Sequence, residues 1–204
     1  MSLISTIKSN IKLKKIVHWL IIPKHQARPR RWVQWFINPF FHKKGKGATV
    51  CRRTRIDVLP FQKFNIGNYS TIEDFTTINN GVGAVCIGNN SRIGLGNVII
   101  GPVTIGNNVI IAQNVVMSGL NHNYTNIEIP IYLQGETVGT ITIEDDCWIG
   151  ANVVITTGIT IGKHSVVAGG AVVTKDIPAF CVAVGNPARI VKRYNFETKV
   201  WELA

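Results

Sequence analysis

The sequence lacks a long apolar stretch and lacks paired cysteines. It has no run of eighteen or more uncharged apolar residues, which argues against a membrane-spanning helix. The short apolar segment IVHWLII is followed by the basic segment PKHQARPRR instead of a small-residue cleavage site, so we expect no export signal. The cysteines show no CxxC spacing and are predicted to be reduced, buried thiols; they are Cys51, Cys86, Cys147 and Cys181. Together these absences predict a cytoplasmic protein.

Acidic residues are absent from the first part of the chain. Residues 1–56 contain fourteen Lys and Arg and no Asp or Glu, whereas residues 57–204 contain eight basic and eleven acidic residues. Tryptophans at 19, 32 and 35 accompany the basic residues, a combination typical of a segment that lies on a membrane surface. The aromatic residues also fit a cap that covers the end of a repeat. No nucleic-acid-binding motif is present, so we expect no nucleic-acid partner.

What the sequence does have is an aliphatic residue at every sixth position, on both sides of one interruption. The positions in this phase are Ile87, Ile93, Ile99, Ile105, Ile111 and Met117, then Ile143, Ile149, Ile155, Ile161, Val167 and Val173. A period of six fits neither an α-helix nor an alternating strand, although a sandwich of short strands is an alternative. It is typical of the hexapeptide parallel β-helix. We therefore predict an all-β solenoid of about five coils, with strands about 4.8 Å apart.

The interruption between Met117 and Ile143 predicts a loop over 118–142 that projects from the solenoid, and this loop contains one histidine, His122. A neutral imidazole removes a hydroxyl proton well near pH 7, because its ordinary pKa is about 6.5. A loop residue is also accessible to substrates, whereas an inward-facing one is not. The alternative is an exposed histidine without function. His164 is expected in an ordinary turn.

The segment WIGANVVITTGITIGKHSVVAGGAVVTKDIPAFCVAVGNPARIVK, together with GLNHNY around His122, resembles the hexapeptide-repeat acyltransferases. The resemblance is to the sugar O-acetyltransferases of the maltose, galactoside and colanic-acid types, and it covers roughly residues 60–195. It implies a left-handed coil, acetyl-CoA as the acyl donor, and a homotrimer with its active sites between adjacent prisms.

The resemblance also implies roles for individual residues. His122 would be the general base, Ala151 would lie at the acyl end of the coenzyme, Gly169 and Thr174 would contact its pantetheine arm, and Lys175 and Arg189 would bind its phosphates. Structural roles stay open for these positions: a crowded corner at Gly169, and a helix cap at Arg189. The GNPAR turn would fold back along the prism and lead into a C-terminal helix from about Ile190 to Lys199. No Cys or Ser stands beside His122 as a nucleophile, which favours direct transfer.

The expected function is acetyl-CoA-dependent O-acetylation of a sugar hydroxyl, in capsule, exopolysaccharide or lipid-linked glycan synthesis at the inner face of the membrane. The alternatives are an N-acetyltransferase of an amino sugar or nucleotide sugar, and a non-catalytic β-helical scaffold. A β-helical carbonic anhydrase needs three zinc-binding histidines and the repeat region has two, so no metal is expected. The expected domains are a basic aromatic extension (1–56), the β-helix (57–180), and a C-terminal segment with its helix (181–204).

Overall fold

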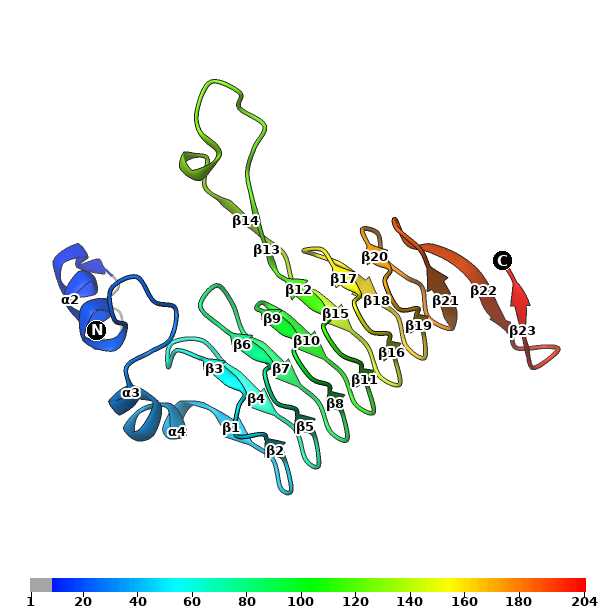
Figure 1. Cartoon of the computed structure of the whole chain (residues 1–204), viewed down its shortest axis with the longest axis horizontal. Helices are drawn as coiled ribbons and strands as arrows, with labels where there is room; N and C mark the ends of the chain where they lie inside the picture. Colours follow the sequence, from blue (N-terminus) through cyan, green and yellow to red (C-terminus); the bar gives the residue numbers. More distant parts are fainter. Residues whose placement is uncertain (1–8) are drawn as a thin grey trace.

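The computed structural model describes residues 9–204, most of which form a three-sided prism of short parallel strands (Figure 1). Sheet A contains β1 (Lys43–Lys44), β4 (Phe64–Ile66), β7 (Val85–Ile87), β10 (Val103–Ile105), β15 (Ile141–Ile143) and β18 (Thr160–Ile161). Sheet B contains β2 (Thr49–Val50), β5 (Thr71–Ile72), β8 (Arg92–Ile93), β11 (Ile110–Ile111), β16 (Trp148–Ile149), β19 (Val166–Val167) and β21 (Cys181–Val184). Sheet C contains β3 (Arg55–Asp57), β6 (Thr77–Asn79), β9 (Val98–Ile100), β12 (Val116–Ser118), β17 (Val154–Ile155) and β20 (Val172–Val173).

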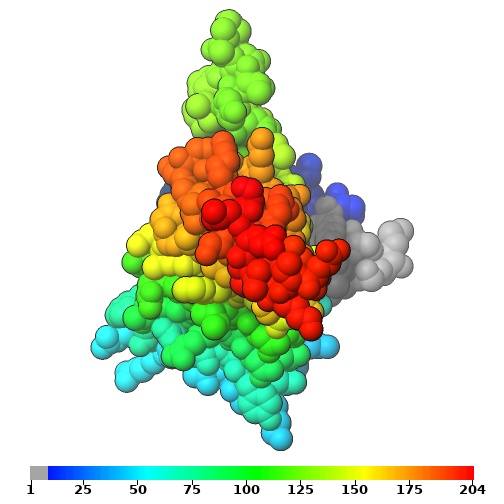
Figure 2. All heavy atoms as spheres, turned by 90° about the vertical axis from the view of Figure 1, so that its right-hand side faces the viewer, coloured from blue at the N-terminus to red at the C-terminus, as the bar shows by residue number. Residues whose placement is uncertain are grey.

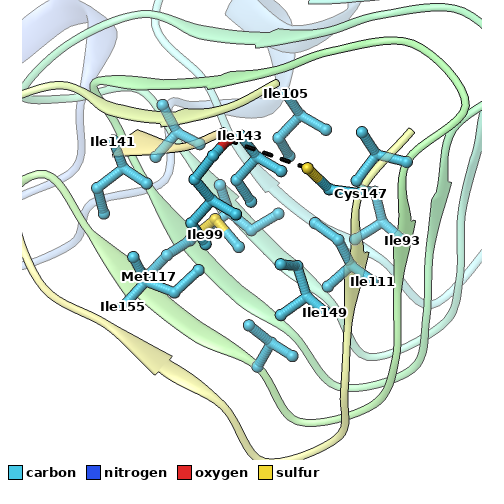
Figure 3. Packing of buried hydrophobic residues seen from close by; sticks show 14 of the residues in the cluster. Ile93, Ile99, Ile105, Ile111, Met117, Ile141, Ile143, Cys147, Ile149 and Ile155 are labelled. Carbon is cyan, nitrogen blue, oxygen red and sulfur yellow. Dashed lines mark hydrogen bonds between the residues drawn. The ribbon is translucent and has the colours of Figure 1, made fainter. Parts of the chain in front are cut away.

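The six-residue period produces the prism because each strand directs one aliphatic side chain inward and the next strand begins at a corner. Stacked partners such as Ile87 and Ile105 are 18 residues apart, one full turn of three strands. The repeat positions named above form the core, where the isoleucines and Met117 lie in stacked rows (Figure 3). The predicted all-β solenoid is therefore confirmed. It has about six turns instead of five, because β1–β3 already form a turn within the segment assigned to the extension.

The corners between sheets A and B require glycine and left-handed residues. A Cβ on Gly88 would lie 2.5 Å from the carbonyl oxygen of Gly106, a distance that real side chains essentially never show. One turn position in this corner adopts positive φ in successive coils, as in Asn90 (φ 55°), Asn108 (φ 56°) and His164 (φ 57°). Asn tolerates this backbone better than most residues. His164 is exposed in this turn, as expected, and stacks on Phe180.

The buried polar side chains of the prism bond to the backbone of the next coil, as Ser91 does through Oγ to the carbonyl oxygen of Gly106 (2.8 Å). Cys147 occupies a similar place, and its Sγ lies 3.2 Å from the carbonyl oxygen of Gly162. Cys147 and Cys181 are buried, but Cys51 and Cys86 are only half-buried. The prediction of buried thiols therefore holds for two of the four.

We expect Cys147 to resist alkylation in the folded protein. Burial raises the pKa of its thiol to about 11, so almost none of it is thiolate near neutral pH. Mass spectrometry after brief treatment with iodoacetamide should find Cys51 or Cys86 modified well before Cys147. Denatured protein, in which all four react, is the control, and equal labelling in the folded state would contradict the expectation.

In the part of the chain that the structure describes, helices α2 (Ile11–Ile21), α3 (Arg31–Phe36) and α4 (Asn38–Phe41) lie at the N-terminal end of the prism (Figure 1). They attach to the first turns through the buried Val33, through a hydrogen bond from Asn38 Nδ2 to the carbonyl oxygen of Val58 (2.8 Å), and through an ion pair between Arg28 and Asp57 (3.0 Å). The α3–α4 segment therefore acts as a cap on the prism.

His42 follows this cap and lines a hollow of about 290 Å³, with both ring nitrogens buried and without a hydrogen-bond partner. Burial lowers the pKa of His42 below its ordinary 6.5, so as pH falls the imidazole is protonated in the unfolded chain before it is protonated in the folded chain. The free energy of unfolding is therefore unaffected by protonation of His42 at neutral pH and decreases as pH falls through 6.5 toward the lower pKa of the folded state. We expect the melting temperature of His42→Phe to fall less than that of the wild type across this range. Parallel melting curves against pH would contradict this.

The C-terminal segment is a β-hairpin, so the predicted helix from Ile190 to Lys199 is wrong. Strands β22 (Arg189–Asn195) and β23 (Val200–Leu203) continue sheet B in antiparallel pairing with β21. The last solenoid strand would otherwise expose unpaired N–H and C=O groups, and β22 satisfies them. Aromatic contacts among Tyr194, Phe196 and Trp201 hold the hairpin, which lies across the end of the prism that faces the viewer in Figure 2. Within residues 9–204, no helix has the length and apolarity needed to cross a membrane.

Candidate functional site

The predicted projecting loop is a hairpin arm that leaves the prism after β12 (Figure 1). Its strands are β13 (Leu120–His122) and β14 (Glu136–Val138), and a short 3₁₀ turn, Ile131–Leu133, lies near the tip. Ile105 and Ile143 are stacked partners 38 residues apart, against 18 for Ile87 and Ile105 in the preceding coil, so the arm is a twenty-residue insertion. The coils on either side remain in register, and Gly139 N–H at the base of the arm donates to Thr157 Oγ1 (3.1 Å) in the next coil.

His122 lies in β13, where it pairs with Glu136 across the hairpin. Its Nδ1 is 3.8 Å from Glu136 Oε1, which is longer than a hydrogen bond but close enough for electrostatic attraction. A carboxylate on this side favours the proton on Nδ1 and leaves Nε2 as the basic atom of the ring. The sequence pattern did not single out Glu136, because only the hairpin register brings it opposite the histidine. The side chain of His122 is 58% exposed, so one chain does not enclose it.

The tip of the arm carries uncovered apolar side chains. Ile127 is 92% exposed, and Tyr132 and Leu133 are also exposed. The tip nevertheless has internal order, because Gln134 Nε2 donates to the carbonyl oxygens of Asn126 (2.7 Å) and Ile129 (3.0 Å). An ordered, exposed apolar surface of this kind indicates a contact with another surface.

The residues implied for the coenzyme lie along the two edges of sheet C, beyond the root of the arm. Ala151 and Gly169 stack at the corner between sheets B and C, where Gly170 N–H donates to the carbonyl oxygen of Ala151 (2.8 Å). A Cβ on Gly169 would lie 3.2 Å from that same oxygen, so the corner is crowded. Thr174 and Lys175 follow β20 on the opposite edge, between sheets C and A, which also carries the arm. Both are exposed.

Arg189 begins β22 and is exposed, with its Nη1 donating to the carbonyl oxygen of its neighbour Ala188 (2.9 Å). Within the described chain, neither Arg189 nor Lys175 forms an ion pair with a carboxylate, so both charges are available to an anion. The GNPAR turn packs against the last coil, where Ala188 N–H donates to the carbonyl oxygen of Val172 in β20 (2.8 Å), and the chain then continues across the end of the prism.

The single chain does not bring His122 together with these residues. The root of the arm and β20 are separated by β17, which places them about 10 Å apart along the prism at the usual strand spacing. Between the two edges, sheet C presents the partly exposed Val116, Val154 and Val172, an apolar strip that connects the two groups. Trp148 instead lines a surface hollow of about 490 Å³ over sheet B with Trp201. Residues 9–204 contain no cluster of His, Cys, Asp or Glu that could hold a metal.

Comparison with known proteins identifies the repeat that forms the prism. The family model for the hexapeptide repeat of succinyl-transferase matches residues 84–118 and 140–175, on either side of the arm. The chain contains the hexapeptide repeat that this family model describes. Among the relatives of this hexapeptide-repeat protein, galactoside O-acetyltransferase of Escherichia coli is 44% identical over 98 residues, which are 48% of this chain and 47% of that protein. A tetrahydropyridine-dicarboxylate N-acetyltransferase of Staphylococcus aureus is 40% identical over 90 residues, which are 44% of this chain and 33% of that protein.

Solved structures resemble most of the chain. A maltose O-acetyltransferase from Clostridium difficile is 26% identical with a TM-score of 0.53, and covers 92% of this chain and 87% of its own. The S84A mutant of AntD, an N-acyltransferase from Bacillus cereus in complex with dTDP-4-amino-4,6-dideoxyglucose and coenzyme A, has a TM-score of 0.68 at 21% identity and covers 81% of this chain and 91% of its own. At this identity the second likeness shows the left-handed β-helix fold alone. The chain spans less than half the length of the two curated relatives.

Proposed function

We propose that the protein transfers an acetyl group from acetyl-CoA to a hydroxyl group of a sugar, with His122 as general base. The observation that carries the proposal is the position of His122, on an arm that interrupts the repeat and opposite a carboxylate at 3.8 Å. The family and the names of its O-acetyltransferase relatives support acyl transfer as the reaction class.

The proposed chemistry needs one base and no covalent enzyme intermediate. Nε2 of His122 removes the acceptor proton as the sugar oxygen attacks the thioester carbonyl, and a tetrahedral intermediate forms. When this intermediate collapses, the C–S bond breaks, the acetyl ester remains on the sugar, and the imidazolium returns its proton to the departing CoA thiolate. Glu136 holds the ring and stabilises its charge in the protonated state.

The coenzyme is proposed to lie along sheet C. The apolar strip of Val116, Val154 and Val172 suits a pantetheine arm, with Ala151 and Gly169 on one edge and Thr174 on the other. The unpaired charges of Lys175 and Arg189 suit the phosphates of the nucleotide end. Small residues at the first edge allow close approach of the coenzyme.

We further propose that the active site is completed by a neighbouring copy in a homotrimer. Two features support this. The His122 side chain is 58% exposed in one chain, and the arm carries the uncovered Ile127, Tyr132 and Leu133 at its tip. A second prism beside the arm would cover the tip and turn the exposed histidine into the wall of a cleft.

The setting proposed for the reaction is the synthesis of a capsule, exopolysaccharide or lipid-linked glycan in the cytoplasm. Four cysteines without a disulfide support a reducing compartment. A polymer or lipid-linked acceptor fits a site on an exposed arm near its root, since such a site does not have to enclose the whole acceptor.

The experiment is a thiol-release assay with purified protein, acetyl-CoA and a panel of sugars that offer either hydroxyl or amino groups. Release that requires a hydroxyl acceptor is the expected result. An N-acetyltransferase is the second candidate, favoured by the relative that is named an N-acetyltransferase, and release only with amino sugars would replace our proposal with it. No binding of acetyl-CoA in calorimetry would indicate a scaffold.

A further inference from the structure

Helix α2 presents a mixed basic and apolar stripe to solvent, in which the Trp19 ring lies 5.7 Å from the Arg30 guanidinium. Lys12, Lys15, Ile16, Trp19 and Leu20 are exposed, and their three- and four-residue spacings place them on one continuous side of the helix. The opposite side, formed by Leu13, Val17 and Ile21, is half-buried. None of the residues of α2 is fully buried. The helix therefore rests on the chain by one apolar side and leaves a second one uncovered.

Helices α3 and α4 add uncovered aromatic side chains at the same end of the prism (Figure 1). Trp35 is 66% exposed, Phe36 is 67% exposed and Phe40 is 85% exposed. A single exposed aromatic residue is common in soluble proteins, but several on neighbouring elements mark an interaction surface. We call the exposed stripe of α2 and these three aromatics the N-terminal surface.

The charge of this region has one sign. Residues 1–56 contain no acidic residue, and in the described chain only Arg28 and Arg55 of this segment form ion pairs, both with Asp57. Lys12, Lys14 and Lys15 on α2 have no carboxylate partner among residues 9–204. The N-terminal surface therefore combines uncompensated positive charge with uncovered apolar area.

We propose that the N-terminal surface docks the protein on an anionic lipid bilayer. Tryptophan favours the headgroup region, lysine is attracted by anionic headgroups, and an amphipathic helix of 11 residues lies in the plane of the interface instead of spanning it. The aliphatic Ile16 and Leu20 on the same stripe suit acyl chains, whereas nucleic-acid bases would favour aromatic stacking alone. The N-terminal surfaces of two copies would repel each other, because residues 1–56 contain no carboxylate side chain.

The test is co-sedimentation of the full chain with phosphatidylcholine vesicles that contain or lack phosphatidylglycerol. The wild type should bind the anionic vesicles more strongly, and Lys12→Gln/Lys15→Gln should lower that partition coefficient by roughly 30-fold. Trp19→Ala/Phe40→Ala should abolish the part of the binding that survives high salt. Lys192→Gln/Lys199→Asn, which removes two exposed charges from the C-terminal hairpin, is the matched control and should bind like the wild type.

Three results would overturn the proposal: equal or absent binding to both vesicle types, binding to a single-stranded RNA in the absence of vesicle binding, or an altered oligomeric state of the N-terminal variants in sedimentation velocity. The last would show that the N-terminal surface is a contact between subunits. Activity with acetyl-CoA and a soluble sugar should be the same in the wild type and the N-terminal variants. Failure of docking can therefore be distinguished from failure of the proposed reaction.

Discussion

His122→Ala is expected to lower kcat by roughly 10²- to 10⁴-fold, the usual contribution of a general base. The KM for acetyl-CoA should change little, because the coenzyme is proposed to bind along sheet C and not on the arm. Steady-state thiol release with a saturating hydroxyl acceptor measures both quantities. Glu136→Gln keeps the shape of the pair but removes its charge, and we expect a smaller loss of kcat from it than from His122→Ala.

The matched control is His164→Asn. His164 is an exposed histidine in a left-handed turn, and Asn occupies the same corner in earlier coils at Asn90 and Asn108. This variant should therefore fold normally and retain full activity. If His122→Ala keeps wild-type kcat while His164→Asn is impaired, the base has been assigned to the wrong histidine.

Ile105→Ala is expected to lower the free energy of unfolding by about 2–5 kcal/mol, the range for deleting most of a large buried aliphatic side chain. Ile105 is 2% exposed and stacks between Ile87 and Ile143, so the cavity would be enclosed on both sides along the prism axis. Equilibrium unfolding in urea, followed by circular dichroism, gives the difference.

Thr104→Ala is the control for this variant. Thr104 precedes Ile105 in β10, but its side chain points outward and is exposed. Its replacement should change the unfolding free energy by less than about 0.5 kcal/mol. Equal effects of the two variants would mean that the six-residue register assigned to sheet A is wrong.

The fold could be predicted from the sequence because the information is repeated. Each coil contributes inward aliphatic residues and turn residues in the same phase. The same inward position therefore recurs from Ile87 to Met117 and again from Ile143 to Val173. The C-terminal end of the chain is not repeated, and the predicted helix is wrong there. The segment from Ile190 to Lys199 forms a strand and a turn because β22 pairs with the open edge at β21, a tertiary condition that local sequence does not express.

The candidate site was likewise only partly predictable from the sequence. The broken period located His122, but Glu136 became visible only when the hairpin register placed it opposite. Ala151 and Gly169 share one corner, as stacked coils require, but the single chain leaves them apart from His122. The repeat pattern does not indicate which residues meet between copies of the chain, so the roles of Ala151, Gly169, Thr174, Lys175 and Arg189 stay predictions.

The twenty-residue arm leaves and re-enters the prism without disturbing the pairing of Ile105 with Ile143. Folding of the stack is thereby uncoupled from the length and composition of the arm, because every coil keeps its neighbours when the arm changes. Under the proposed function, variation that is confined to the arm would change the choice of acceptor at little cost in stability.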